Sequence, residues 1–161
     1  MPWHISSYVS IKGNKQGQFK GNAGPNTDKI GGLQFNFGAR SPRNAATGQA
    51  SGKRPMEPLS ITKELALATP QIYEAFATNE VRNPVLVEFV KISPQGQDYV
   101  YYTITLTNAA VSSVRQFVDL GLKQAAGATS TLLETVTFTF QKIEMEDKDG
   151  KTSAVDNWSQ A

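Results

Sequence analysis

The sequence contains no cysteine and a single histidine among its 161 residues. Without cysteine the chain can form no disulfide, present no thiolate nucleophile and bind no zinc through sulfur. The one histidine, His4, stands close to a chain end, where neither a Ser-His-Asp triad nor a multi-histidine metal site is expected. We therefore expect a protein that is not an enzyme and that carries no metal or other cofactor.

Long apolar runs and an excess of one charge are also missing. No window approaches the roughly 20 apolar residues of a membrane-spanning helix, and the first residues lack the basic and apolar segments of a secretory signal. Sixteen basic residues against fourteen acidic ones leave a net charge of +2, which does not favour nucleic acid. We expect a cytoplasmic protein without membrane insertion, and any export would take it in the folded form without a signal peptide.

Three local patterns resemble chemical motifs but lack their essential parts. Residues 48–54 have too few positions between their glycines for a phosphate loop. Residues 147–150 resemble only the start of a calcium loop, and a hairpin turn is the better interpretation. Glu144 and Glu146 share one face of a predicted strand, and we interpret them as part of a solvated surface and not as a paired acid and base.

The composition is that of one folded domain spanning residues 1–161, with 39% hydrophobic and 19% charged residues. Alternation of apolar and polar residues predicts strands through most of it. We predict a mainly β fold of about seven or eight strands with one short α-helix, as a small barrel in preference to a sandwich. The predicted strands are residues 7–12, 30–37, 59–63, 85–92, 98–107, 109–118, 134–146 and 152–158.

The strand predicted at residues 134–146 has two different faces. Val136, Phe138 and Phe140 recur at spacing two and are predicted to face the core. The residues between them form a polar row on the other face: Thr135, Thr137, Thr139 and Gln141.

The helix is predicted after residue 68, where the apolar spacing changes. Thr69 is predicted to cap it, with Pro70 at its first position and Asn79 at its end. Its apolar stripe is predicted to contain Ile72, Tyr73 and Phe76, together with Ala77.

Residues 38–58 form a long segment with almost no apolar side chain except Met56. A connection of this length inside a compact domain is commonly either functional or disordered. One interpretation is a solvated loop, and the other is a projecting arm that docks on a partner. Its basic residues are Arg40, Arg43, Lys53 and Arg54. Aromatic residues, on which bases would stack, are not interleaved with them, so nucleic acid is not the expected partner. These residues would better suit acidic residues of a neighbouring subunit.

Four segments together resemble the haemolysin-coregulated protein (Hcp) family, the inner-tube subunit of type VI secretion systems. They are SGKRPMEPLSITK at residues 51–63, TPQIYEA at 69–75, VTFTFQKIE at 136–144 and DNW at 156–158. Each is short, but their order and spacing extend over most of the chain. One departure is that many family members have a histidine just before the Pro-Leu pair, where this chain has Met56 and Glu57.

The resemblance implies a homohexameric ring that stacks with other rings into a hollow tube. It implies that the tube carries or stabilises effectors and is expelled when an outer sheath contracts, with sheath, spike and effector proteins as partners. It also implies that residues 38–58 reach the adjacent ring, and that the polar row of residues 135–141 lines the channel or meets the next subunit. The ring-stacking residues would be Arg40, Arg43, Lys53, Arg54, Met56 and Glu57.

A second hypothesis is a monomeric, soluble β-barrel that acts as a binding module or as a small effector protein such as a hydrolase. The absence of a nucleophile–base pair argues against the hydrolase. The mass of the native protein distinguishes the two hypotheses, because only the first requires a closed ring.

Overall fold

The computed structural model describes residues 7–21, 29–52, 57–118 and 132–157, which form eleven strands and one helix. Their bounds in chain order are β1 Ser7–Gly13, β2 Gly17–Gln18, β3 Ile30–Gly32, β4 Gln34–Asn36, β5 Leu59–Glu64, α1 Ala68–Ala77, β6 Arg82–Ile92, β7 Asp98–Thr107, β8 Ala110–Phe117, β9 Leu133–Thr139, β10 Lys142–Asp147 and β11 Thr152–Asn157. The mainly β fold with one helix is therefore confirmed.

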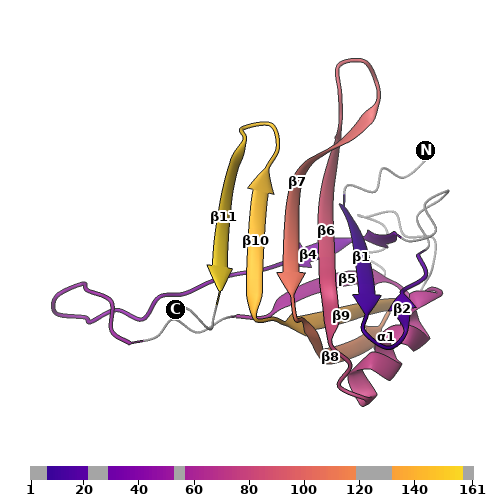
Figure 1. The fold of residues 1–161 in the computed structure, drawn as a ribbon, viewed down its shortest axis with the longest axis horizontal. Coiled ribbons are helices and arrows are strands. Elements are labelled where there is room, and N and C mark those ends of the chain that lie inside the picture. Colours follow the sequence, from indigo (N-terminus) through magenta and orange to yellow (C-terminus); the bar gives the residue numbers. More distant parts are fainter. Residues whose placement is uncertain (1–6, 22–28, 53–56, 119–131, 158–161) are drawn as a thin grey trace.

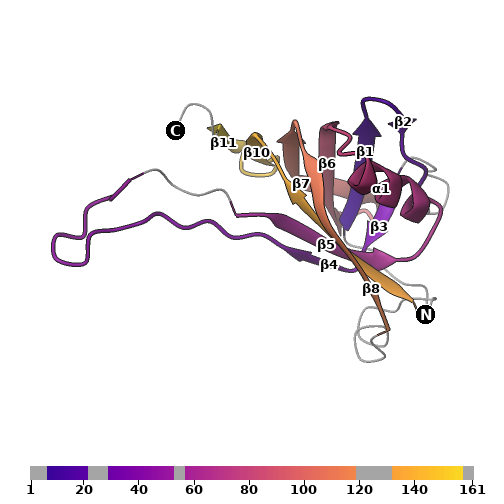
Figure 2. The ribbon, with the colours of Figure 1, turned by 90° about the horizontal axis from the view of Figure 1, so that it is seen from below.

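The strands form two sheets that pack face to face around one hydrophobic core. The larger sheet has seven strands in the order β11-β10-β7-β6-β1-β2, with β3 also paired to β1, and the smaller sheet has four in the order β4-β5-β9-β8. Strands of the two sheets cross steeply (Figure 1), and α1 lies at one end of the sandwich beside β1 (Figure 2). Crossed sheets of this kind usually share strands that bend at their corners.

The barrel predicted from the sequence is wrong for the described residues, because the two sheets are not closed on each other. Among the described residues, the outer strands are β11, β2 and β3 in the larger sheet and β4 and β8 in the smaller one, and no ladder joins the outer strands of one sheet to those of the other. The chain passes between the sheets at bends around Leu33, Asn108 and Phe140. These bends interrupt the strand ladders that would otherwise continue from one sheet into the other.

The single strand predicted at residues 134–146 is two strands in different sheets. β9 pairs with β5 and β8, whereas β10 pairs with β7 and β11. The spacing of the buried residues changes at the bend. Phe138 and Phe140 are buried at spacing two, whereas the next buried residue, Ile143, follows Phe140 at spacing three. Two consecutive polar residues, Gln141 and Lys142, mark this change. Residues 30–37 are divided in the same way, into β3 and β4.

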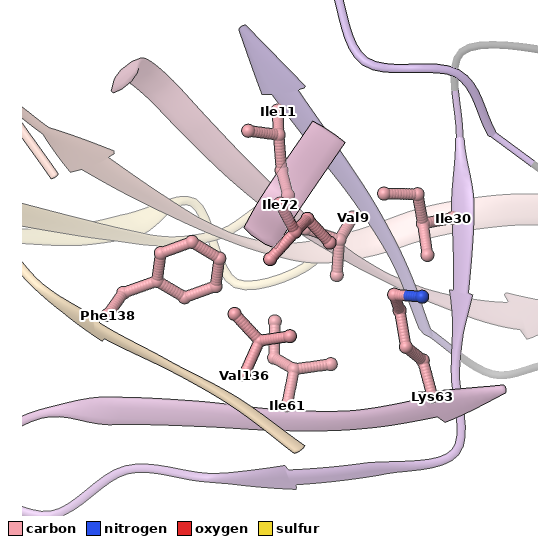
Figure 3. A pocket seen from close by; sticks show the side chains of 8 residues that line it. All are labelled: Val9, Ile11, Ile30, Ile61, Lys63, Ile72, Val136 and Phe138. Atoms are coloured by element: carbon pink, nitrogen blue, oxygen red, sulfur yellow. The ribbon is translucent and has the colours of Figure 1, made fainter. Parts of the chain in front are cut away.

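The inward face predicted for the first part of that strand is confirmed. Val136, Phe138 and Phe140 are buried, and Phe138 is only 1% exposed. They pack with apolar side chains from both sheets and from α1 in a single cluster. Figure 3 shows Phe138 and Val136 from β9 facing Val9 and Ile11 from β1 and Ile72 from α1.

The start of α1 differs from the prediction. Leu67 is the N-cap residue and makes no side-chain capping bond, so Thr69 does not cap the helix and Pro70 is not its first residue. The Thr69 hydroxyl instead donates a hydrogen bond to Glu134 Oε2 at 2.8 Å. A contact with a strand 65 residues away has replaced the local cap.

The apolar stripe predicted for α1 is correct for Ile72 only. The buried residues of the helix are Ala68, Ile72 and Ala75, which the 3.6-residue period places on one face. Tyr73 and Phe76 are 56% and 37% exposed, so they lie beside that face and not within it.

The predicted end of α1 at Asn79 is confirmed by its backbone. Asn79 has φ of 56° and its N–H donates to Phe76 O, while the N–H of Glu80 donates to Ala75 O. This pair of bonds is the Schellman arrangement, in which a left-handed residue stops the helix. The chain then turns directly into β6.

Candidate assembly surfaces

The predicted arm is an extended hairpin that projects from the sandwich (Figures 1 and 2). Its two sides are joined by the N–H of Ser51 to Pro42 O at 2.9 Å and the N–H of Asn44 to Gln49 O at 2.7 Å. At its base the carboxylate of Glu57 lies beside Gly38. These bonds give the arm a defined direction although its described residues contribute nothing to the core.

The tip of the arm is ordered by one asparagine side chain. Asn44 Oδ1 accepts the N–H groups of Ala46 at 2.8 Å and Thr47 at 3.1 Å, and the N–H of Gly48 donates to Asn44 O. Gly48 has φ of 72°, a conformation that costs glycine little. The turn is therefore stabilised locally, without a contact to the sandwich.

Half of the ring-stacking residues named from the sequence lie in the described part of this arm. Arg40 and Arg43 are exposed, and Glu57 is half-buried at the base. Lys53, Arg54 and Met56 lie outside the described residues. The arm thus presents Arg40 and Arg43 to solvent, where a partner can reach them.

A second surface is the outward side of the four-stranded sheet, which we call the polar face. Strand pairing places Thr137 opposite both Ser60 and Ser113, and Thr135 opposite both Thr62 and Arg115. The hydroxyls of Thr62 and Thr135 are 2.9 Å apart and share a hydrogen bond. The polar face consists of Gln34, Asn36, Ser60, Thr62, Ser113, Arg115, Thr135, Thr137 and Thr139.

The polar face is hollowed between β4, β5 and β9. The hollow has a volume of about 410 Å³ and is lined by Gln34, Phe35, Asn36, Ser60, Thr62 and Thr135. Apart from Phe35 its walls are amides and hydroxyls. Such a surface can form many weak hydrogen bonds but offers little apolar area to a protein interface.

Gln141 does not continue the threonine row predicted for this face. It lies beyond the end of β9, where the chain bends towards the other sheet. Its Oε1 accepts a hydrogen bond from Asn108 Nδ2 at 2.8 Å, which ties two of the corner segments together. The structure thus brings Thr135, Thr137 and Thr139 together and separates Gln141 from them.

The outer side of α1 forms a third, more apolar surface. The rings of Tyr73 and Phe76 are 5.9 Å apart, and Leu67 before the helix is 65% exposed. Aromatic side chains are enriched at protein interfaces. This side of the helix is consequently suited to contact another protein surface.

A buried ion pair holds α1 against the sheets. Lys63 Nζ is 3.0 Å from Glu134 Oε2, and both side chains are almost fully buried. Thr69 links them, because its hydroxyl donates to Glu134 and lies 3.3 Å from Lys63 Nζ. Burial lowers the pKa of Lys63, and the charge of Glu134 opposes this shift only in part.

The ammonium of Lys63 also borders the small cavity of Figure 3, which has room for about 10 Å³ beside Val9, Ile30 and Ile61. A space of this size is at the lower limit for one water molecule and is too small for a ligand. The sequence analysis did not identify Lys63 and Glu134. The available signal was their position, because Lys63 lies two residues after the buried Ile61 and Glu134 two residues before the buried Val136, on the inward face of each strand.

A second buried carboxylate, Glu80, connects the end of α1 to the turn after β1. Its oxygens accept the N–H groups of Lys15 and Gln16, each at 3.0 Å, and the side-chain amide of Gln16 at 3.1 Å. Burial alone would raise the pKa of Glu80, but these bonds and the nearby Arg82 lower it overall. A side chain at Gly13 would overlap this carboxylate, so the close approach requires glycine.

The described residues hold neither a metal-binding cluster nor a membrane-spanning helix. They contain no group of three or more histidine, cysteine or acidic residues placed to hold a metal ion. The helix they contain is too short and too polar to cross a bilayer.

Comparisons with known proteins agree with this arrangement. The chain is 29% identical over 163 residues to the major exported protein of Pseudomonas aeruginosa, and the match covers 94% of each. Among solved structures it is similar to an Hcp protein with a TM-score of 0.84 at 21% identity, covering 95% of this chain and 97% of that one.

Two further structures have the same fold. They are Hcp1 of Escherichia coli EAEC 042 (TM-score 0.82, 24% identity, 96% and 99% coverage) and the secreted protein Hcp3 of Pseudomonas aeruginosa (TM-score 0.75, 25% identity, 94% and 99% coverage). The family described as "Type VI secretion system effector, Hcp" matches residues 7–146. Because this match spans most of the chain, the protein belongs to the Hcp family and is a component of the type VI secretion tube.

Proposed function

We propose that the protein assembles as a homohexameric ring and that the rings stack into a hollow tube. The observation that carries this proposal is the arm, an ordered hairpin that leaves the sandwich and has no partner within the described chain. An ordered projection loses little entropy on binding, so its shape suits a docking element. Membership of a tube-forming family supports the same assembly.

The open edges of the four-stranded sheet support closure into a ring. β4 and β8 lie at its two opposite edges. A cyclic ring joins two different surfaces of each subunit, and two unlike edges of one sheet meet this requirement. Pairing between subunits would also cover strand edges that are otherwise prone to nonspecific association.

We assign ring stacking to the arm and the channel lining to the polar face. Arg40, Arg43 and Glu57 would contact the next ring, together with Lys53, Arg54 and Met56. The polar face offers few apolar anchors to an interface, whereas hydroxyls and amides suit a water-filled channel through which effectors pass. The exposed aromatic side of α1 remains available for contacts outside the channel.

The remaining parts of the proposal follow from this assembly. The whole chain, residues 1–161, acts as one domain with residues 38–58 as its extension, and it has no catalytic role. Sheath, spike and effector proteins are its partners. The rings form in the cytoplasm and leave without a signal peptide when the sheath contracts.

The mass of the purified protein under native conditions tests the ring. We expect a species of six times the 17.5 kDa chain mass. A protein that stays monomeric at high concentration would instead support the second hypothesis, a soluble binding module.

A further inference from the structure

The polar face carries almost no charge. Its described side chains are amides and hydroxyls except for Arg115, and the same side of the sheet continues to Glu64 on β5 and Phe117 on β8. Glu64 stands at the rim, at the end of β5 and opposite Leu133. Arg115 stands further in, on β8 opposite Thr135, and is exposed. The face therefore has one prominent cation among neutral groups.

The guanidinium of Arg115 is held in place by its own strand. Its Cζ lies 5.0 Å from the centroid of the Phe117 ring, two residues along β8. Stacking on an aromatic ring leaves the N–H groups at the guanidinium edge free to donate hydrogen bonds. Among the described residues no carboxylate forms an ion pair with Arg115. The group is positioned and available.

We propose that Arg115 gives the channel a preference for effectors with carboxylate-rich surfaces. This inference rests on the proposed function, in which the polar face lines the channel. A guanidinium binds carboxylates through two parallel hydrogen bonds, whereas the surrounding hydroxyls and amides do not discriminate by charge. Ring symmetry repeats Arg115 once per subunit, so the channel contains a ring of positive charge that attracts anionic cargo.

An acidic protein surface fits this site better than nucleic acid does. Arg115 lies over the ring of Phe117, and Phe35 is the one aromatic residue in the described lining of the hollow. The face therefore lacks the series of aromatic platforms on which successive bases stack. One cation per subunit also provides a weak field compared with the basic grooves that follow a phosphate backbone. Weak, charge-selective contact is what a channel needs if its cargo must later leave.

The test uses assembled rings and two fluorescein-labelled peptides of equal length, one repeating Glu-Ser-Gly and one repeating Lys-Ser-Gly. Fluorescence anisotropy at low salt measures their dissociation constants. We expect wild-type rings to prefer the acidic peptide and Arg115→Gln to weaken that binding about fivefold, a modest change because exposed charge pairs are individually weak. Arg115→Glu should reverse the preference. The control is Lys12→Gln, which removes one positive charge, as Arg115→Gln does, but from an exposed residue of β1. It should leave the binding of both peptides unchanged.

Cysteine labelling separates failure of this inference from failure of the proposed function. Since the chain has no cysteine, Thr137→Cys gives a single reactive site on the polar face. In rings a small maleimide should react there, and maleimide-activated albumin, too large to enter a channel, should not. If albumin reacts, the polar face lies outside the channel. Both the proposal that this face lines the channel and the proposed role of Arg115 are then wrong.

If the site is protected but Arg115→Gln leaves the peptide preference unchanged, only the role of Arg115 is overturned. A single-stranded DNA oligonucleotide serves as the third probe. If it binds as tightly as the acidic peptide, and through Arg115, the site recognises anions in general and the preference for acidic protein surfaces is wrong.

Discussion

The sandwich and the arm are ordered by different kinds of interaction. The sandwich buries apolar side chains from two sheets and a helix, and most of its free energy comes from that burial. The arm buries almost nothing and is shaped by backbone hydrogen bonds and the side chain of Asn44. Because the arm adds so little to folding, we infer that it serves to bind a partner. The following predictions run from changes in the sandwich to changes in the arm.

The largest loss of folding stability is expected from Phe138→Ala. Phe138 is 1% exposed in the centre of the core, and removing a buried phenylalanine side chain typically costs about 3–5 kcal/mol. Thermal or denaturant unfolding measures this change. The matched control is Phe76→Ala on the outer side of α1, which should cost much less. An unchanged midpoint for Phe138→Ala would show that β9 does not face the core.

Breaking the buried ion pair should have the next largest effect. We expect Lys63→Met to lower the free energy of unfolding by about 3 kcal/mol, because it leaves the Glu134 carboxylate buried without its cation. The double variant Lys63→Met/Glu134→Leu should recover most of that loss, since no unpaired charge remains. Equal losses in the single and double variants would contradict this account.

Acid should weaken the contact between α1 and the turn after β1. The pKa of Glu80 in the folded protein lies below its ordinary value of 4.5, so between the two pKa values the unfolded chain binds more protons than the folded one. The stability that Glu80 contributes is therefore present above about pH 4.5 and is lost as pH falls through the folded pKa.

Urea unfolding at a series of pH values between 6 and 3 measures this effect. Glu80→Gln should show a shallower fall of stability with acid than wild type. Glu74→Gln, on the exposed side of α1, should follow wild type. Identical slopes for Glu80→Gln and wild type would mean that its hydrogen bonds do not favour the ionised form.

The smallest effect on folding is expected from the arm. Deleting residues 45–51 removes the tip and one side of the hairpin without touching the core, so the unfolding midpoint and the rings should be unchanged. Electron microscopy should nevertheless show fewer stacked tubes, because the stacking contact is gone. If the rings themselves dissociate, the arm closes the ring and does not join rings.

Much of the fold was accessible from local patterns. Alternation predicted β1, β5, β6, β7 and β8 close to their observed bounds, and Phe138 was correctly placed in the core. Alternation does not, however, show where a strand bends and changes direction. A strand keeps its period of two up to a bend, so residues 134–146 were predicted as one strand although the chain changes sheets after Phe140.

The contacts that position α1 were not accessible from the sequence. Thr69 and Pro70 have the local features of a helix start, but the Thr69 hydroxyl binds Glu134, a partner brought near only by the sheet. The exposure of Tyr73 and Phe76 has the same origin, since the sheets select which side of the helix is covered. Local rules describe which elements form, and packing decides which faces they use.

Negative-stain electron microscopy of the full chain tests the central claim most directly. We expect ring-shaped particles with sixfold symmetry that stack end to end into columns at high concentration. Isolated single-subunit particles at every concentration would contradict the account, because the arm and the open sheet edges would then have no partner.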